Sequence, residues 1–191
     1  MDTRYDTMRA AVAARLSPGA AGHSERVAQT AAALAERYGV DIDDARVAGL
    51  LHDWCKDVPG EELIRLAEEY GISVTGVDRA VPYLLHGAVA AAVLPADFPW
   101  LTPGIIAAIE SHTYGCAGID DLGMIVYIAD TIEPGRSHRS ADALREAVGA
   151  LSLPELFERT YAESVSHLVD GRRPIHPSTV ETWNSLVAGD R

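Results

Sequence analysis

The sequence predicts an all-α protein that folds as one compact helical bundle, and three observations support this prediction. Alanine is very frequent, and together with leucine, glutamate and arginine it favours helix. Apolar residues recur at helical spacing in one segment after another, and no convincing pair of strands stands out. Hydrophobic residues make up 48% of the 191 residues, which is enough for the core of one domain or at most two small ones.

In the first half of the chain, each expected helix is followed by a turn signal. The expected helices cover residues 3–16, residues 23–38, a segment from an Asp41 or Asp43 cap to about Trp54, and residues 61–70. The turn signals are Ser17-Pro18-Gly19, Gly39, Pro59-Gly60 and Gly71. Residues 72–82 contain the β-prone run ISVTGV, which is short and isolated, so we expect a loop there.

The second half continues with helices separated by proline and glycine. They are expected at residues 86–94, from Pro103 to about 112, and at 120–132, 140–150, 154–170 and 177–188. Thr102-Pro103 is typical of a cap followed by a first-turn proline. Gly171 stands where a C-terminal cap is expected.

Charge and cysteine usage exclude several classes of protein. The formal charge of −12 argues against a nucleic-acid binder and against docking on anionic membranes. Cys55 and Cys116 lie in unrelated segments and are expected to be free thiols. The first residues lack the apolar region of a signal peptide, and no apolar stretch is long enough to span a membrane. We therefore expect a soluble cytoplasmic protein.

Imidazole and carboxylate side chains recur near the ends of the expected helices. The six candidates are His23, His52, Asp53, His86, His112 and Asp130. Imidazole suits Fe, Zn, Ni and Cu, and a carboxylate adds affinity for Mn and Fe and can bridge two ions. His52 and Asp53 point about 100° apart on a helix, so both can reach one site. Six protein ligands are too many for one catalytic metal, so the set predicts two ions that share an aspartate.

Cations accompany these ligands and favour a phosphate substrate. Lys56, the only lysine of the chain, follows Asp53 by three residues, and Arg26 follows His23 by three. We predict catalytic roles for Lys56, Asp53 and Arg26. Arg136 in the turn EPGR, with Arg172 and Arg173 after Gly171, can grip phosphates. Because two metal ions can activate water and clamp phosphoryl oxygens, the residues predict hydrolysis of a phosphate ester or anhydride.

The ordered ligand set resembles a known family. The order of His23, His52-Asp53 and Asp130 resembles the metal signature of the HD-domain phosphohydrolase superfamily, and His86 and His112 match its dinuclear branch. The segments AGLLHDWCKD, LLHGAVAA, IESHTYG, IVYIADTIEPGR and GRRPIHPSTVE resemble the YqeK-type symmetrical diadenosine tetraphosphate hydrolases, over about residues 22–187. Two residues depart from the pattern of this family, the tyrosine in SHTYG and Cys55, and neither stands at a candidate ligand position.

The resemblance implies a reaction, a metal and substrate contacts. A dinucleoside tetraphosphate would be cut at its centre to give two ADP, with iron as the metal and Mn, Co or Ni as substitutes. The implied substrate contacts are His23, Lys56, His112, Thr113, Arg136, Arg173, Pro174, Ile175, His176 and Pro177. The resemblance also implies a single HD domain over residues 1–191, with a metal core at about 20–135 and C-terminal helices at about 140–188 that complete the pocket. A homodimer is compatible with the sequence.

Other interpretations stay open at this point. An HD-type di-iron oxygenase, a hydrolase of another nucleotide or phosphate ester, or a regulatory module with structural metals would use the same ligands. Arg26 has an alternative role in a surface pair with Glu25 or Glu36. His138 and His167 are expected to be surface or packing residues, and Tyr83 a core aromatic.

Overall fold

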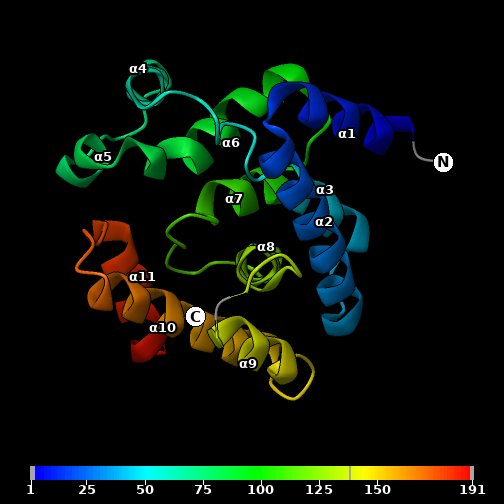
Figure 1. Cartoon of the computed structure of the whole chain (residues 1–191), viewed down its shortest axis with the longest axis vertical. Helices are drawn as coiled ribbons and strands as arrows, with labels where there is room; N and C mark the ends of the chain where they lie inside the picture. Colours follow the sequence, from blue (N-terminus) through cyan, green and yellow to red (C-terminus); the bar gives the residue numbers. More distant parts are fainter. Residues whose placement is uncertain (1–2, 138, 190–191) are drawn as a thin grey trace.

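The computed structural model describes residues 3–137 and 139–189. Within them the chain forms helices joined by turns and loops (Figure 1). Its elements are α1 (Thr3–Arg15), α2 (Pro18–Tyr38), α3 (Ile42–Leu51), α4 (Gly60–Glu69), α5 (Gly76–Ala80), the 3₁₀ helix η1 (Pro82–Leu85), α6 (His86–Asp97), α7 (Pro103–Ser111), α8 (Asp121–Ile132), α9 (Arg139–Ala147), α10 (Leu153–Asp170) and α11 (Pro177–Ala188). No strand occurs in these two ranges, where Val148 and Leu151 form an isolated bridge. The all-α prediction is confirmed. No described helix is long and apolar enough to cross a membrane.

Helix α8 lies at the centre of the bundle. It contacts α2, α3, α7 and α10, and almost all of its residues are buried (Figure 1). A helix that is apolar all round is typical of the inside of a protein. The N-terminal helices α1–α3 lie on one side of α8, α4–α7 lie on a second, and α9–α11 lie on a third (Figure 1). The last turn of α8 therefore faces the ends of several other helices.

Proline and aspartate caps set most helix boundaries. Asp41 caps α3 by accepting hydrogen bonds from the amides of Asp43 and Asp44, and the hydroxyl of Thr102 caps α7. Helix α2 begins at Pro18, five residues before the expected start, because proline is favoured in the first turn. His23 therefore lies in the second turn of α2, and the prediction that it stands near a helix start is corrected.

Three other expected boundaries are also corrected. Residues 72–82 are a loop only in part, since residues 72–75 have no regular structure, whereas Thr75 and Asp78 form a reciprocal capping box that starts α5 at Gly76. Helix α6 continues past residue 94 through Pro95, and α9 ends at residue 147 rather than 150. Gly171 is the C-terminal cap of α10, as expected, although its φ is −77° and Arg172 takes the left-handed φ of 50°. His138, an expected surface residue, lies outside the described residues.

Helices α2 and α3 approach one another closely at Gly49. A Cβ atom at this position would lie 3.0 Å from Ala28 Cα and 3.1 Å from Val27 O. These are backbone atoms of a helix, so they cannot move aside without shifting α2. The glycine thus lets α3 carry His52 close to α2, which carries His23.

Gly49→Ala should therefore destabilise the protein by about 1–3 kcal/mol, the usual cost of overpacking a core. Thermal and urea unfolding followed by circular dichroism measure the effect. Gly19→Ala is the matched control, because a Cβ at position 19 meets nothing within 4 Å and alanine favours helix. Equal stability of the Gly49→Ala variant and the wild type would contradict the close approach of α2 and α3.

Candidate metal centre

Helix ends bring the six predicted ligands together. His52 and His112 are the first residues after α3 and α7, His86 is the first residue of α6, and Asp130 lies in the last turn of α8. His23 comes from the second turn of α2. The helix bodies form the core, while their ends leave room for side chains to converge.

Backbone carbonyls orient three of the imidazoles in the same way. The Nδ1 atoms of His52, His86 and His112 lie 2.8, 2.6 and 2.7 Å from the carbonyl oxygens of Gly49, Tyr83 and Ile109, respectively. In each case the carbonyl is three residues earlier. A carbonyl can only accept, so Nδ1 carries the proton and donates it. Each Nε2 then presents a lone pair to the centre of the site, as metal-binding histidines do.

The fourth imidazole is oriented by a carboxylate. His23 Nδ1 lies 3.1 Å from Glu133 Oε1, and Glu133 Oε2 accepts hydrogen bonds from Arg26 Nε and the Gly135 amide, both at 2.5 Å. Arg26 therefore faces Glu133, not Glu25 or Glu36. Arg145 holds the same turn by donating to three of its carbonyl groups, at Ile132, Glu133 and Arg136.

The carboxylate of Asp53 lies between two groups of histidines. Its Oδ2 is 3.2 Å from His52 Nε2 and 3.5 Å from His23 Nε2. Its Oδ1 is 3.1 Å from His86 Nε2 and 3.9 Å from His112 Nε2. The two oxygens thus face different ligand pairs, and the side chain is only 1% exposed.

Asp130 joins the first of these pairs. Its Oδ1 lies 2.8 Å from His23 Nε2 and 3.8 Å from His52 Nε2. The same oxygen accepts a hydrogen bond of 2.6 Å from Arg136 Nη2, and Arg136 Nε donates to the Asp130 carbonyl at 2.9 Å. Lys56 Nζ lies 2.6 Å from Asp53 Oδ2. Two cations therefore lie at the edge of the ligand cluster.

The donor set fits divalent metal ions. His52 Nε2 and Asp53 Oδ1 are buried and have no well-aligned hydrogen-bond partner among the described residues, although other polar atoms lie near. His86 Nε2 and His112 Nε2 lie 2.9 Å apart, and both carry lone pairs. Buried lone pairs that face one another are unfavourable unless a cation lies between them. Histidine with carboxylate suits Fe, Mn, Co, Ni and Zn.

The protonation states also suit metal binding. Burial alone would raise the pKa of Asp53 and lower that of His52. Without metal ions the attraction between the two groups outweighs burial, so the pKa of Asp53 lies well below its usual range and that of His52 is raised; a metal ion would take the place of that proton on His52. Burial alone would also raise the pKa of Asp130, but the neighbouring His23 and His52 imidazoles and the Arg136 guanidinium outweigh burial and lower that pKa. Burial and the neighbouring imidazoles lower the pKa of His112 to about 3. Ionised carboxylates and a neutral imidazole are the forms that bind cations.

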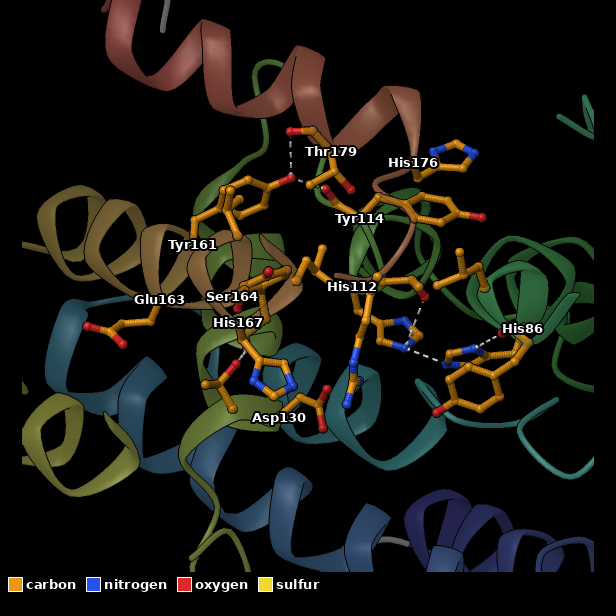
Figure 2. Close-up of a pocket in the computed structure, with 18 of the residues that line it drawn as sticks. His86, His112, Tyr114, Asp130, Tyr161, Glu163, Ser164, His167, His176 and Thr179 are labelled. Carbon is orange, nitrogen blue, oxygen red and sulfur yellow. Dashed lines mark hydrogen bonds between the residues drawn. The ribbon is translucent and has the colours of Figure 1, made fainter. Parts of the chain in front are cut away.

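A cavity of about 610 Å³ opens onto this cluster. Asp53, His86, His112 and Asp130 line it together with side chains from α10 and from the α10–α11 connection. Figure 2 shows His86, His112 and Asp130 with Ser164 and His167 of α10 around this space. Three cations line it, namely Lys56, Arg136 and Arg173. Three carboxylates, those of Asp53, Asp130 and Glu163, line it as well, so the formal charges of the lining balance. Bound metal ions would make the cavity positive, which suits an anionic ligand.

The predicted substrate contacts divide into two groups. Lys56, His112, Thr113, Arg136, Arg173, Pro174 and His176 line the cavity. His23, Ile175 and Pro177 do not border it, and neither does Arg26, which was predicted to be catalytic. His23 contacts Asp130, and Arg26 contacts Glu133. Arg172 is exposed and also lies off the cavity.

Sequence reasoning missed several residues around the site. Glu133, which orients His23, lies inside the quoted segment IEPGR, so its position directly after an expected ligand helix was the available signal. Tyr83, expected in the core, is exposed and lines the cavity. His167, expected as a surface or packing residue, is exposed and also borders the cavity (Figure 2). Tyr114 and Tyr161 line it as well.

The geometry agrees with comparisons to known proteins. The family model described as "HD domain" matches residues 20–135, which contain all six candidate ligands. The chain belongs to the HD-domain family. The symmetrical bis(5′-nucleosyl)-tetraphosphatase of Bacillus subtilis is 30% identical over 87% of this chain and 89% of that protein. The protein of the same name from Staphylococcus aureus is 29% identical over 85% of this chain and 84% of its own length.

A solved structure of an HD-family protein shares the fold. A Clostridium acetobutylicum protein, described as a predicted HD superfamily hydrolase involved in NAD metabolism, superposes with a TM-score of 0.90 and 32% identity. The similarity covers 97% of each chain. The resemblance to the HD superfamily and its symmetrical tetraphosphatase branch, predicted from the sequence, is confirmed.

Removing the carboxylate of Asp53 should abolish the stabilisation that bound metal ions give to the folded protein. Added Mn²⁺ should raise the melting temperature of the metal-stripped protein, because an ion that binds only the folded state at about 100 times its Kd adds about 2.7 kcal/mol. Asp53→Asn should lose this rise and keep its helical circular dichroism. Asp43→Asn, at an exposed site of the same helix region, serves as control. An undiminished rise in Asp53→Asn would contradict the assignment.

Glu133→Gln should weaken metal binding without removing a ligand. Loss of the charge weakens the hydrogen bonds that orient His23, and such changes typically cost about 10–100-fold in metal affinity. Competition with a fluorescent chelator measures the Kd. Glu25→Gln breaks a surface pair with Arg9 and should leave the Kd unchanged. Equal Kd values for both variants would show that Glu133 does not orient His23.

Proposed function

We propose that the protein is a metal-dependent hydrolase that cuts diadenosine tetraphosphate symmetrically, with water, into two ADP. The observation that supports it is a buried histidine–aspartate cluster that opens onto a cavity lined by Lys56, Arg136 and Arg173. Relatives that match most of the chain carry the name of this activity. The adenosine preference rests on those relatives, and the chemistry of phosphate hydrolysis rests on the cluster and its cations.

The arrangement of Asp53 supports two ions rather than one. Because its Oδ2 faces His23 and His52 while its Oδ1 faces His86 and His112, the carboxylate can bridge two metals. Asp130 would complete the first site. We propose iron as the resident metal, with Mn, Co or Ni as substitutes, since the histidine-rich donor set accepts each of them.

The side chains of this protein would bind and orient the polyphosphate. Bound metal ions would supply an activated water and a clamp for phosphoryl oxygens. Lys56 is held by Asp53 at the cavity edge, where its ammonium can neutralise charge on a phosphoryl oxygen. Arg136, anchored on Asp130, would hold a phosphate from the other side of the cluster. Arg26 contacts Glu133, so we propose that its role is to position His23.

The C-terminal helices would contribute the far wall of the substrate site. Arg173, Pro174 and His176 line the cavity beside residues of α10, consistent with contacts to the nucleotide. We propose a single HD domain over residues 1–191, with the metal core at about 20–135 and helices at about 140–188 that complete the pocket. A cytoplasmic location and a homodimer stay predictions from the sequence.

The product pattern tests the function. The metal-stripped protein should be loaded with Fe²⁺, Mn²⁺ or Co²⁺ and incubated with diadenosine tetraphosphate, and the products separated by ion-exchange chromatography. Only ADP should form, at two per substrate, because the central P–O–P bridge is broken. Lys56→Met should lower kcat at least tenfold, since removing one such charge stabiliser typically costs 10²–10³-fold.

Other outcomes would identify the alternatives. Equal amounts of AMP and ATP would show an asymmetric cut. Oxygen consumption with an organic substrate and no phosphate release would favour the di-iron oxygenase. A structural role for the ions would be favoured by two results together. The metal-loaded protein would hydrolyse no nucleotide, and its metal ions would carry no exchangeable water.

A further inference from the structure

Tyr114 forms part of the cavity wall, two residues after the candidate ligand His112. It belongs to SHTYG, where the expected pattern has no tyrosine, and it lines the cavity beside Thr113. The ring of His176 stacks on one face of the Tyr114 ring, with centroids 4.1 Å apart and planes at 12° (Figure 2). The part of the Tyr114 ring that His176 does not cover therefore borders the cavity.

The position of Tyr114 is fixed from its side chain and from its backbone. Its hydroxyl donates to Asp78 Oδ1 at 3.2 Å. Its carbonyl accepts a hydrogen bond from the Tyr161 hydroxyl (Figure 2). The next residue, Gly115, has a φ of 73°, and a Cβ there would lie 2.9 Å from the Tyr161 ring. The ring is thus held in one orientation before any ligand binds.

His176 is itself fixed, and both of its ring nitrogens are used. Its Nδ1 accepts a hydrogen bond of 3.1 Å from the Ser178 amide, so the proton lies on Nε2, which is 3.2 Å from Asp78 Oδ2. The imidazole has no further donor for a phosphate. Asp78 is in turn held by Thr75 at the start of α5. Asp78, His176 and Tyr114 therefore form one network.

The network buries a carboxylate and an imidazole, and their hydrogen bonds offset the cost of removing them from water. Asp78 is 1% exposed and His176 is 7% exposed. What the network achieves is a rigid aromatic surface in the cavity. A base stacked on an aromatic side chain contributes about 1–3 kcal/mol, and a preorganised ring loses little entropy on binding.

We propose that Tyr114, backed by His176 and Asp78, is the surface on which a nucleobase of the substrate stacks. The proposal rests on the proposed function and adds the base subsite to it. Lys56 and Arg136 lie against the metal ligands and suit the phosphates, which leaves the aromatic wall for the base. Tyr83 is a weaker platform, because Lys56 Nζ lies 5.8 Å from its ring centroid, at the phosphate end of the cavity.

The test separates base binding from phosphate binding. The metal-loaded protein is titrated with 1,N⁶-etheno-ADP, whose fluorescence reports on base stacking, and inorganic tripolyphosphate is measured as a competitor. Tyr114→Leu should weaken etheno-ADP binding about tenfold or more. It should change tripolyphosphate binding by less than about twofold, because the substitution removes only the free energy of base stacking. Tyr114→Phe keeps the ring and should stay within about threefold of wild type for both ligands. Tyr70→Leu, an exposed tyrosine away from the cavity, is the control.

Each other result overturns the proposal. Unchanged etheno-ADP binding by Tyr114→Leu, an equal loss of both ligands, or a selective loss only in Tyr83→Leu would place the base elsewhere. If Tyr114→Leu does not fold, Asp78→Asn, which releases His176 and Tyr114, should weaken etheno-ADP binding severalfold and leave tripolyphosphate binding unchanged. Hydrolysis by the wild type is scored separately, so a protein that binds etheno-ADP through Tyr114 but does not cut diadenosine tetraphosphate would refute only the proposed function.

Discussion

The structure depends on one electrostatic constraint, which is the gathering of several electron-pair donors around the buried carboxylate of Asp53. Four imidazole Nε2 atoms and a second carboxylate, from Asp130, lie within 4 Å of its oxygens or of one another. Such a cluster repels itself unless cations neutralise it. The folded chain must therefore supply enough favourable packing, mainly around α8, to hold the donors in place. The buried core and the close approach of α2 to α3 at Gly49 do this.

Support for the ligands comes from two different sources. Three histidines are fixed by carbonyl groups of their own helices or turns, which need no distant partner. His23 instead depends on Glu133, which is 110 residues away and is held by Arg26 and the backbone of Gly135. Within the first pair, His23 thus relies on tertiary packing between α2 and α8, whereas His52 is fixed locally by the Gly49 carbonyl of α3. The second pair relies on the local geometry of α6 and α7.

The sequence predicted most of the helices because their caps and apolar spacing are local signals. The ligand candidates could also be proposed, since histidine and aspartate near helix ends are uncommon and chemically specific. The sequence could not predict contacts between distant polar residues, such as His176 with Asp78 or Arg26 with Glu133. It also misjudged residues 72–82, because the β-prone residues there outweighed a Thr–Asp capping pair that is visible in the sequence. Tyr83 was expected in the core because spacing alone does not distinguish a core aromatic from one in a cavity wall.

The hydrogen bonds from the three histidines to carbonyls three residues earlier restrict how the chain can vary in length. Each of these rings directs its Nε2 atom to the centre of the cluster and donates its Nδ1 proton to a carbonyl group at a helix or turn end. One inserted residue inside α3 or α7 would rotate the terminal ring by about 100° and move it by about 1.5 Å along the axis. Insertions and deletions should therefore be confined to connections between helices that lie off the cavity, such as the exposed residues 116–118. The lengths of these helices are thus as much a part of the donor geometry as the identity of the side chains.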